Sequence, residues 1–161
     1  LDRAIELVSR ARRVEFFAMG NSRAVALDGQ HKFFRFRIPT SLYGDAHLFR
    51  LAAELLQPGD VVIAVSNSGS IAELLEAVDI ARRAGADVIA ISNSQSPLAR
   101  KASVCLAVDH AEDSTSFLSM ISRILQLLVI DILAVGISVD GQHEDAQQDS
   151  AGRVRISHLG V

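Results

Sequence analysis

Serine residues surround a single glycine in the segment Ser66-Asn67-Ser68-Gly69-Ser70. An apolar, β-branched run at 61–65 precedes this segment, and a helical pattern that includes Glu73 follows it. The free N–H groups and the dipole at the start of a helix favour an anion. Serine hydroxyls add donors, and a glycine lets the backbone approach closely. The strand–loop–helix pattern therefore predicts an anion-binding turn; the plainer interpretation is a capped turn that binds nothing.

Three further polar loops follow predicted strands. They are Gly20-Asn21-Ser22, where Ser22 is predicted to be a helix N-cap, then Ser92-Asn93-Ser94, and then the acidic loop 109–115. Ligands of open parallel α/β sheets bind beyond the carboxyl ends of the strands, so we expect the four loops to share one site. The first three loop cores lack Lys and Arg, although Arg23 is adjacent. Hydroxyls and backbone amides would therefore hold the anion, which favours a sugar phosphate.

A nucleotide ligand is disfavoured because these loops offer no apolar or aromatic slot for a base. Neither a G-x-G-x-x-G fingerprint nor a Walker sequence with its lysine is present. The five histidines are scattered and the single cysteine, Cys105, lies in an apolar run, so we expect no metal and no cofactor.

Alternating strand and helix patterns position these loops. Together they predict an α/β fold, a three-layer αβα sandwich with a five-stranded parallel sheet. The strands are predicted at 14–18, 39–43, 61–65, 87–92 and 104–108. The helices are predicted at 2–13, 23–35, 45–56, 71–84, a short one from 97, and 116 to about 136. We expect one domain over 1–138 and a polar tail over 139–161 that is partly helical around 144–154.

The predicted last helix is apolar nearly all round, which predicts burial on more than one side. One sheet cannot cover all of it, so we expect a homodimer or tetramer through 116–136. Arg123, Gln126 and Asp131 interrupt its apolar sequence and argue against a membrane span. Phe33, Phe34 and Phe36 at the end of an earlier helix are predicted to lie in the core or in a subunit contact.

The composition indicates one globular domain, because 49% of the 161 residues are hydrophobic and 22% are charged. The formal net charge is −3, so these residues lack the basic footprint of a DNA-binding protein. A single cysteine excludes an internal disulfide and suits a cytoplasmic location, as does the lack of a signal peptide pattern.

A family resemblance follows from these motifs. Ser66-Asn67-Ser68-Gly69 with Glu73 resembles the S-x-S-G-x-T-x-E signature of SIS (sugar isomerase) domains, and Gly20-Asn21-Ser22 is similar to their first phosphosugar loop. The segment 96–99 resembles a further recurrent stretch of SIS domains. Within that superfamily, three other segments resemble the effector domains of RpiR-type bacterial transcription regulators, the HexR group in particular; they are 30–36, 122–124 and 131–133. The resemblance extends over roughly 1–137.

The resemblance implies a phosphosugar-sensing domain. The HexR group implies 2-keto-3-deoxy-6-phosphogluconate as the effector whose binding releases DNA. DNA would be contacted only through an N-terminal helix-turn-helix domain, which we expect before Leu1 of a longer protein. Ser22 and Ser66 match the effector serines of the family, Ser68 a phosphate-loop hydroxyl, and Glu73 the acidic position. The remaining candidate ligand-binding residues come from the same two loops; they are Asn21, Asn67, Gly69 and Ser70.

One position departs from the signature, because the family threonine falls at Ile71. Isoleucine cannot donate a hydrogen bond, so one phosphate contact worth about 1–2 kcal/mol is missing unless Ser70 replaces it. Affinity and ligand identity are therefore left open.

Two other functions stay open. A phosphosugar isomerase would need a base and help with ring opening, for which Glu73 and His110 are the candidates. Isomerases of this superfamily tend to place a histidine at the start of the last helix, and none occurs between Ala111 and Gln142, so we favour a sensor without catalytic residues. The third possibility, suggested by Ile71, is a dimerisation module that binds no ligand.

Overall fold

Five parallel strands form the central sheet, in the order β2-β1-β3-β4-β5. The computed structural model describes residues 1–110 and 120–156, with side chains over 1–110 and 120–140. The strands are β1 Arg13–Ala18, β2 Thr40–Tyr43, β3 Asp60–Val65, β4 Asp87–Ser92 and β5 Val104–Ala107. The predicted five-stranded parallel sheet is confirmed. β2 begins one residue later than predicted, after Pro39, which has no N–H to donate to a strand ladder.

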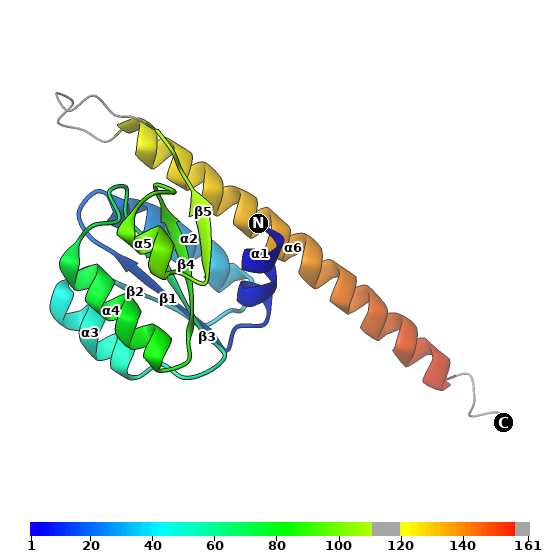
Figure 1. The fold of residues 1–161 in the computed structure, drawn as a ribbon. Helices are drawn as coiled ribbons and strands as arrows, with labels where there is room; N and C mark the ends of the chain where they lie inside the picture. The colour runs from blue at the N-terminus through cyan, green and yellow to red at the C-terminus, as the bar shows by residue number, and fades with distance from the viewer. Residues whose placement is uncertain (111–119, 157–161) are drawn as a thin grey trace.

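Helices cover both faces of the sheet (Figure 1). The helices α1 (Asp2–Ser9), α2 (Ser22–Arg35) and α6 (Met120–Ile156) lie on one face, and α3 (Ala46–Glu54), α4 (Ala72–Arg83) and α5 (Pro97–Lys101) lie on the other. Side chains alternate along a strand, so Phe16 packs under α2 and α6 whereas Phe17 packs with Phe49 of α3. The sandwich therefore has two separate apolar cores.

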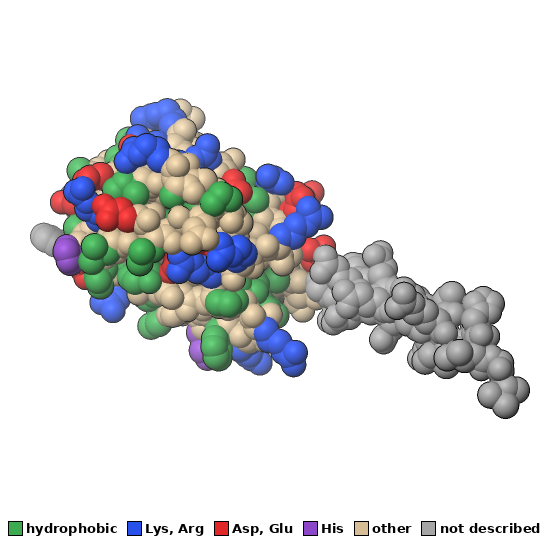
Figure 2. Space-filling view, turned by 90° about the horizontal axis from the view of Figure 1, so that it is seen from below, with side chains coloured by type: hydrophobic (Ala, Val, Ile, Leu, Met, Phe, Trp, Pro, Cys, Tyr) green, Lys and Arg blue, Asp and Glu red, His purple; other side chains and the backbone are tan. Residues whose placement is uncertain are grey.

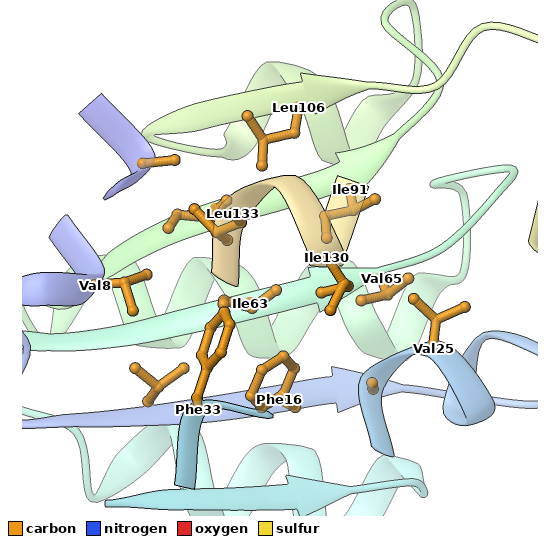
Figure 3. Packing of buried hydrophobic residues seen from close by; sticks show 14 of the residues in the cluster. Val8, Phe16, Val25, Phe33, Ile63, Val65, Ile91, Leu106, Ile130 and Leu133 are labelled. Atoms are coloured by element: carbon orange, nitrogen blue, oxygen red, sulfur yellow. The ribbon is translucent and has the colours of Figure 1, made fainter. Parts of the chain in front are cut away.

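The core beneath α1, α2 and α6 joins elements that are far apart in the sequence. Figure 3 shows Phe33 of α2 against Phe16 of β1, with Ile63 of β3 and Ile130 and Leu133 of α6 close by. The Phe16 and Phe33 rings lie 5.5 Å apart between centroids. Of the three phenylalanines predicted to lie in the core or in a contact, Phe33 is in the core and Phe34 is 70% exposed.

Two predicted helix ends are wrong. The helix predicted over 2–13 ends at Ser9, because the Arg12 N–H donates to the Gly59 carbonyl and Arg13 already pairs with Asp60 in the sheet. The last helix continues through Gly136 to Ile156 and projects beyond the sheet (Figure 1). A Cβ at Gly136 would lie 2.2 Å from Ile5 Cδ1, so this glycine permits the close packing of α1 and α6 and does not end the helix.

The outward side of α6 carries a line of exposed apolar residues, here called the α6 outer stripe: Ile121, Ile124, Leu128, Ile132, Val135 and Val139. Steps of three and four residues place them on one face of a helix. The opposite face, with Ile130, Leu133 and Ile137, is buried in the domain. The predicted all-round apolar helix thus has one covered face and one open face.

By length and composition alone, the segment Met120–Asp140 is able to cross a membrane, contrary to the sequence argument from its polar residues. Two of those residues, Gln126 and Asp131, are accommodated within the domain. Gln126 is buried, and Asp131 accepts a hydrogen bond from Lys32 of α2. Burial lowers the pKa of Lys32, but hydrogen bonds to Asp131 and Asp28 outweigh it and raise this pKa overall. The ion pair ties α2 to α6.

A buried charge cluster lies at the amino ends of β1 and β3, away from the predicted site. Arg13 lies 3.3 Å from the Glu15 carboxylate and 3.2 Å from that of Asp60. Burial raises the pKa of Glu15, and the Asp60 charge adds to this, against the opposing effect of Arg13. Glu15 Oε2 has no hydrogen-bond partner among the residues that the structure describes. The folded protein therefore disfavours the charged form of Glu15.

Glu15→Gln is expected to gain stability relative to the natural protein as the pH rises from about 4 to 7. Because the folded pKa of Glu15 lies above its usual value of 4.5, the stability linked to this group is complete below that value and is lost as the pH rises through the folded pKa. Urea unfolding at several pH values measures the difference. Glu76→Gln, at an exposed position, should show a much smaller pH dependence; a pH-independent difference for Glu15→Gln would contradict the assignment.

Candidate functional site

The loops after β1 and β3 lie side by side at one edge of the sheet. β1 and β3 are parallel neighbours, paired as far as Ala18 and Val65. The chain leaves β1 toward α2 on one face of the sheet and leaves β3 toward α4 on the other face (Figure 1). Open α/β sheets bind their ligands at such a reversal, beyond the carboxyl ends of the strands. The structure therefore brings together the two predicted loops, 20–22 and 66–70.

Ser66 holds the shape of the loop after β3. Its hydroxyl is buried and accepts a hydrogen bond from the Gly69 N–H at 3.1 Å. Ser68 and Ser70 are exposed, and the Ser70 hydroxyl donates to the Ser68 hydroxyl at 3.1 Å. The loop thus presents the Ser68 and Ser70 hydroxyls to solvent, on a turn whose shape the Ser66 hydroxyl holds. Sequence reasoning had grouped all three serines as ligand-binding residues without this division.

Gly69 packs on a serine pair that sequence reasoning missed. A Cβ at Gly69 would lie 2.5 Å from Ser92 Oγ and 2.5 Å from Ser96, and its φ is +57°. The Ser92 and Ser96 hydroxyls lie 3.0 Å apart, and the Leu98 N–H donates to the Gly69 carbonyl at 3.0 Å. The loop after β4 therefore supports the loop after β3. The sequence signal that could have revealed this pair is the spacing of four residues between Ser92, at the end of a predicted strand, and Ser96.

The helix α4 begins without a side-chain cap. Ile71 is in the N-cap position with φ −68° and ψ 116°, and it makes no capping hydrogen bond. The first N–H groups of a helix have no partner inside it and carry a partial positive charge. They follow directly on the exposed hydroxyls of Ser68 and Ser70. Glu73 is exposed in the first turn, where a carboxylate is stabilised by the helix dipole. The arrangement can hold a doubly charged anion on neutral donors.

The loop after β1 differs from its prediction. Ser22 is the first residue of α2 and not its N-cap, and Asn21 in the cap position is already helical, with φ −65° and ψ −28°. The N–H groups of Ser22 and Arg23 donate to the Met19 and Gly20 carbonyls, so no side-chain cap is needed. In the part of the chain that the structure describes, the Asn21 amide and the Ser22 hydroxyl make no hydrogen bond. Both remain available to a ligand.

The loops after β4 and β5 close the edge of the site. Asp109 Oδ1 accepts a hydrogen bond from the Ser94 N–H at 2.8 Å, so these two predicted loops are in contact. The rest of the loop 109–115, from residue 111 onward, lies outside the described residues. Over 1–110 and 120–140, no cluster of His, Cys, Asp or Glu forms a metal site. Cys105 lies half-buried in β5, where burial, with the Asp109 charge adding to it, raises the pKa of the thiol.

A family model described as SIS domain matches residues 7–136. The chain is a member of the SIS domain family. Over 139 residues, this SIS domain is 55% identical to the bifunctional protein glk of Paraburkholderia xenovorans, covering 86% of this chain and 22% of that protein. It is 41% identical to the HTH-type transcriptional regulator HexR of Pseudomonas aeruginosa, again over 86% of this chain and 49% of that protein. The chain spans from about a fifth to about half of the length of these curated relatives.

Solved structures share the fold. The sugar isomerase domain of an RpiR transcription factor from Sphaerobacter thermophilus has a TM-score of 0.77 and 26% identity, covering 94% of this chain and 84% of that one. The Vibrio vulnificus NanR protein complexed with ManNAc-6P has a TM-score of 0.81 and 24% identity, covering 98% of this chain and 61% of that one. The resemblance to SIS domains, with HexR and RpiR regulators among the relatives, is confirmed.

Proposed function

We propose that this SIS domain is the phosphosugar-sensing effector domain of a HexR/RpiR-type bacterial transcription regulator of carbohydrate catabolism. One observation carries the proposal: at the reversal point of the sheet, an uncapped helix start and two exposed serine hydroxyls face a second polar loop that has free donors. The identity of 39–41% to HexR regulators supports a regulator.

The ligand of this proposal is a phosphorylated sugar acid such as 2-keto-3-deoxy-6-phosphogluconate. Its phosphate lies on Ser68, Ser70 and the N–H groups of α4. The rest of the ligand crosses the end of β1 toward Asn21 and Ser22. Ser66, Asn67 and Gly69 shape the loop after β3. Neutral donors suit this phosphate because the helix dipole supplies the positive charge.

Signalling in this proposal runs through α2 and a cytoplasmic homodimer. α2 begins at the ligand loop and is tied to α6 by the Lys32–Asp131 ion pair. The α6 outer stripe packs against a second copy, so a ligand that favours one position of α2 favours one dimer geometry. DNA is contacted by a helix-turn-helix domain outside these residues. Figure 2 shows one face of the domain, on which basic side chains are interspersed with acidic and apolar ones. This distribution supports DNA contact through another domain.

Isothermal titration calorimetry with a panel of phosphosugars and phosphosugar acids tests the proposal. Ser22→Ala is expected to weaken binding about tenfold, which is the loss of one hydrogen bond to a charged group. Ser66→Ala is expected to weaken binding by about the same factor, because it removes the acceptor of the Gly69 N–H that holds the loop after β3 in shape. Circular dichroism should show a folded domain for both variants. Ser9→Ala is the matched control, because this serine lies in α1 and its hydroxyl has no hydrogen-bond partner within the described part of the chain. Binding of no compound in the panel would overturn the proposed function, and unchanged affinity in both variants would show that the site lies elsewhere.

Ile71→Thr is expected to tighten phosphosugar binding by about fivefold to tenfold, because a hydroxyl in the N-cap position of α4 adds a donor beside the phosphate. Ile71→Val, which adds no hydroxyl, is the control for the change in side-chain volume. Calorimetry with the best-bound compound measures both variants. Equal affinities in the two variants would place the phosphate away from the start of α4.

A phosphosugar isomerase is the second candidate, favoured by the exposed carboxylate of Glu73 beside the site. Turnover of a phosphosugar that is lost in Glu73→Gln, with binding retained, would establish the enzyme. A dimer that neither binds nor converts any phosphosugar would leave a structural module.

A further inference from the structure

Arg23 lies at the side of the candidate site that adjoins β2. It follows Ser22 in the first turn of α2. Gly44 is the first residue after β2, and a Cβ there would lie 3.1 Å from Arg23 Nε and 3.3 Å from Arg23 Cζ. The guanidinium therefore rests against the backbone at the carboxyl end of β2, in the space that the missing side chain of Gly44 leaves open.

The charge of Arg23 is not neutralised within the domain. Among the described residues, no carboxylate or other acceptor pairs with its guanidinium. The nearest acidic residue along β2 and its loop, Asp45, uses its Oδ1 to accept the Leu48 N–H at 2.9 Å and cap α3. Arginine stays charged in proteins and presents a fork that matches a carboxylate. An arginine of this kind, next to a free hydroxyl at a ligand edge, is placed to receive an anion.

We propose that Arg23 binds the carboxylate of a phosphorylated sugar acid, whose phosphate lies at the start of α4, and thereby selects acids over neutral phosphosugars. This inference rests on the proposed function. The helix start follows β3 and Arg23 lies at the end of β2, with β1 between them. Neighbouring strands are about 4.8 Å apart, so the two anion positions are separated by about 10 Å. A six-carbon acid phosphorylated at its far end carries its two charges on that scale.

The two positions differ in chemistry, which makes the selection possible. The first holds a phosphate with hydroxyls and backbone N–H groups. The second offers a full positive charge that a neutral sugar cannot use. A neutral phosphosugar therefore loses only the second contact and still binds through its phosphate, whereas an acid uses both.

Calorimetry with 6-phosphogluconate and glucose 6-phosphate tests this, because both compounds carry a phosphate on six carbons and only the first has a carboxylate. Glucose 6-phosphate is also cyclic, so the effect of Arg23→Gln on the preference, and not the preference alone, assigns the contribution of the carboxylate. 2-Keto-3-deoxy-6-phosphogluconate serves as a second acid. The natural protein is expected to bind the better of the two acids at least about tenfold more tightly than glucose 6-phosphate. Arg23→Gln should abolish this preference with little change for glucose 6-phosphate, and Arg23→Lys should keep part of it.

Arg35→Gln, at the far end of α2 and likewise exposed, is the control and should keep the preference. The inference would be overturned if the natural protein showed no preference for the acids, or if Arg23→Gln weakened the binding of all three compounds equally. Either result would leave the proposed function standing. Binding of none of the three by the folded natural protein would instead overturn the proposed function, and this inference with it.

Discussion

Gly69→Ala is expected to abolish phosphosugar binding and to lower the free energy of unfolding by about 2–4 kcal/mol. Two costs add up at this position. The φ of +57° is unfavourable for alanine, and the new Cβ would meet Ser92 and Ser96 at 2.5 Å. Because Ser92 and Ser96 are themselves buried at the end of β4 and the start of α5, they cannot easily move away. The loop must shift instead, which displaces the Ser68 and Ser70 hydroxyls from the start of α4.

Gly20→Ala separates these two costs. Its φ is +55°, but no atom of the described residues lies within 4 Å of a Cβ at this position. Only the backbone cost of about 1–2 kcal/mol is therefore expected. Urea unfolding gives the stability of both variants, and calorimetry gives their phosphosugar affinity. If both variants lost the same stability, the packing of Ser92 and Ser96 against Gly69 would not be the decisive contact.

Leu128→Glu is expected to convert the proposed homodimer into a folded monomer. Leu128 lies at the middle of the α6 outer stripe and is 52% exposed in the single chain, so a carboxylate there is solvated in the monomer but buried in an interface through this stripe. Burying an unpaired charge of this kind costs about 3 kcal/mol or more, which raises the dimer dissociation constant about 100-fold. Sedimentation equilibrium over a range of concentrations measures this constant.

Leu55→Glu is the matched control on the opposite side of the molecule, since Leu55 follows α3 and is 69% exposed. It should leave the dimer intact. If Leu55→Glu dissociated the dimer and Leu128→Glu did not, the interface would lie on the α3 side of the domain. A natural protein that is monomeric at every concentration would contradict the dimer altogether.

The sequence by itself determined the strands and the loops of the candidate site. Strand β4 has the predicted bounds, 87–92, and β3 begins at Asp60, one residue before the predicted run 61–65. A strand buried on both faces is a short run of apolar, β-branched residues, and the run is visible without knowledge of its neighbours. The strand–loop–helix pattern around Ser66–Ser70 is equally local. Since parallel strands end at the same edge of a sheet, the predicted order of elements was enough to bring the loops together.

Only the tertiary structure decided how the loop residues divide their roles. The packing of Gly69 on Ser92 and Ser96, and of Arg23 on Gly44, joins residues that are about 20 or more positions apart, and no local periodicity records such contacts. The same holds for Gly136, which has the sequence signature of a helix end but lies inside α6 because Ile5 occupies the space beside it. A glycine can either end a helix or admit a neighbour, and the choice depends on what the fold places next to it.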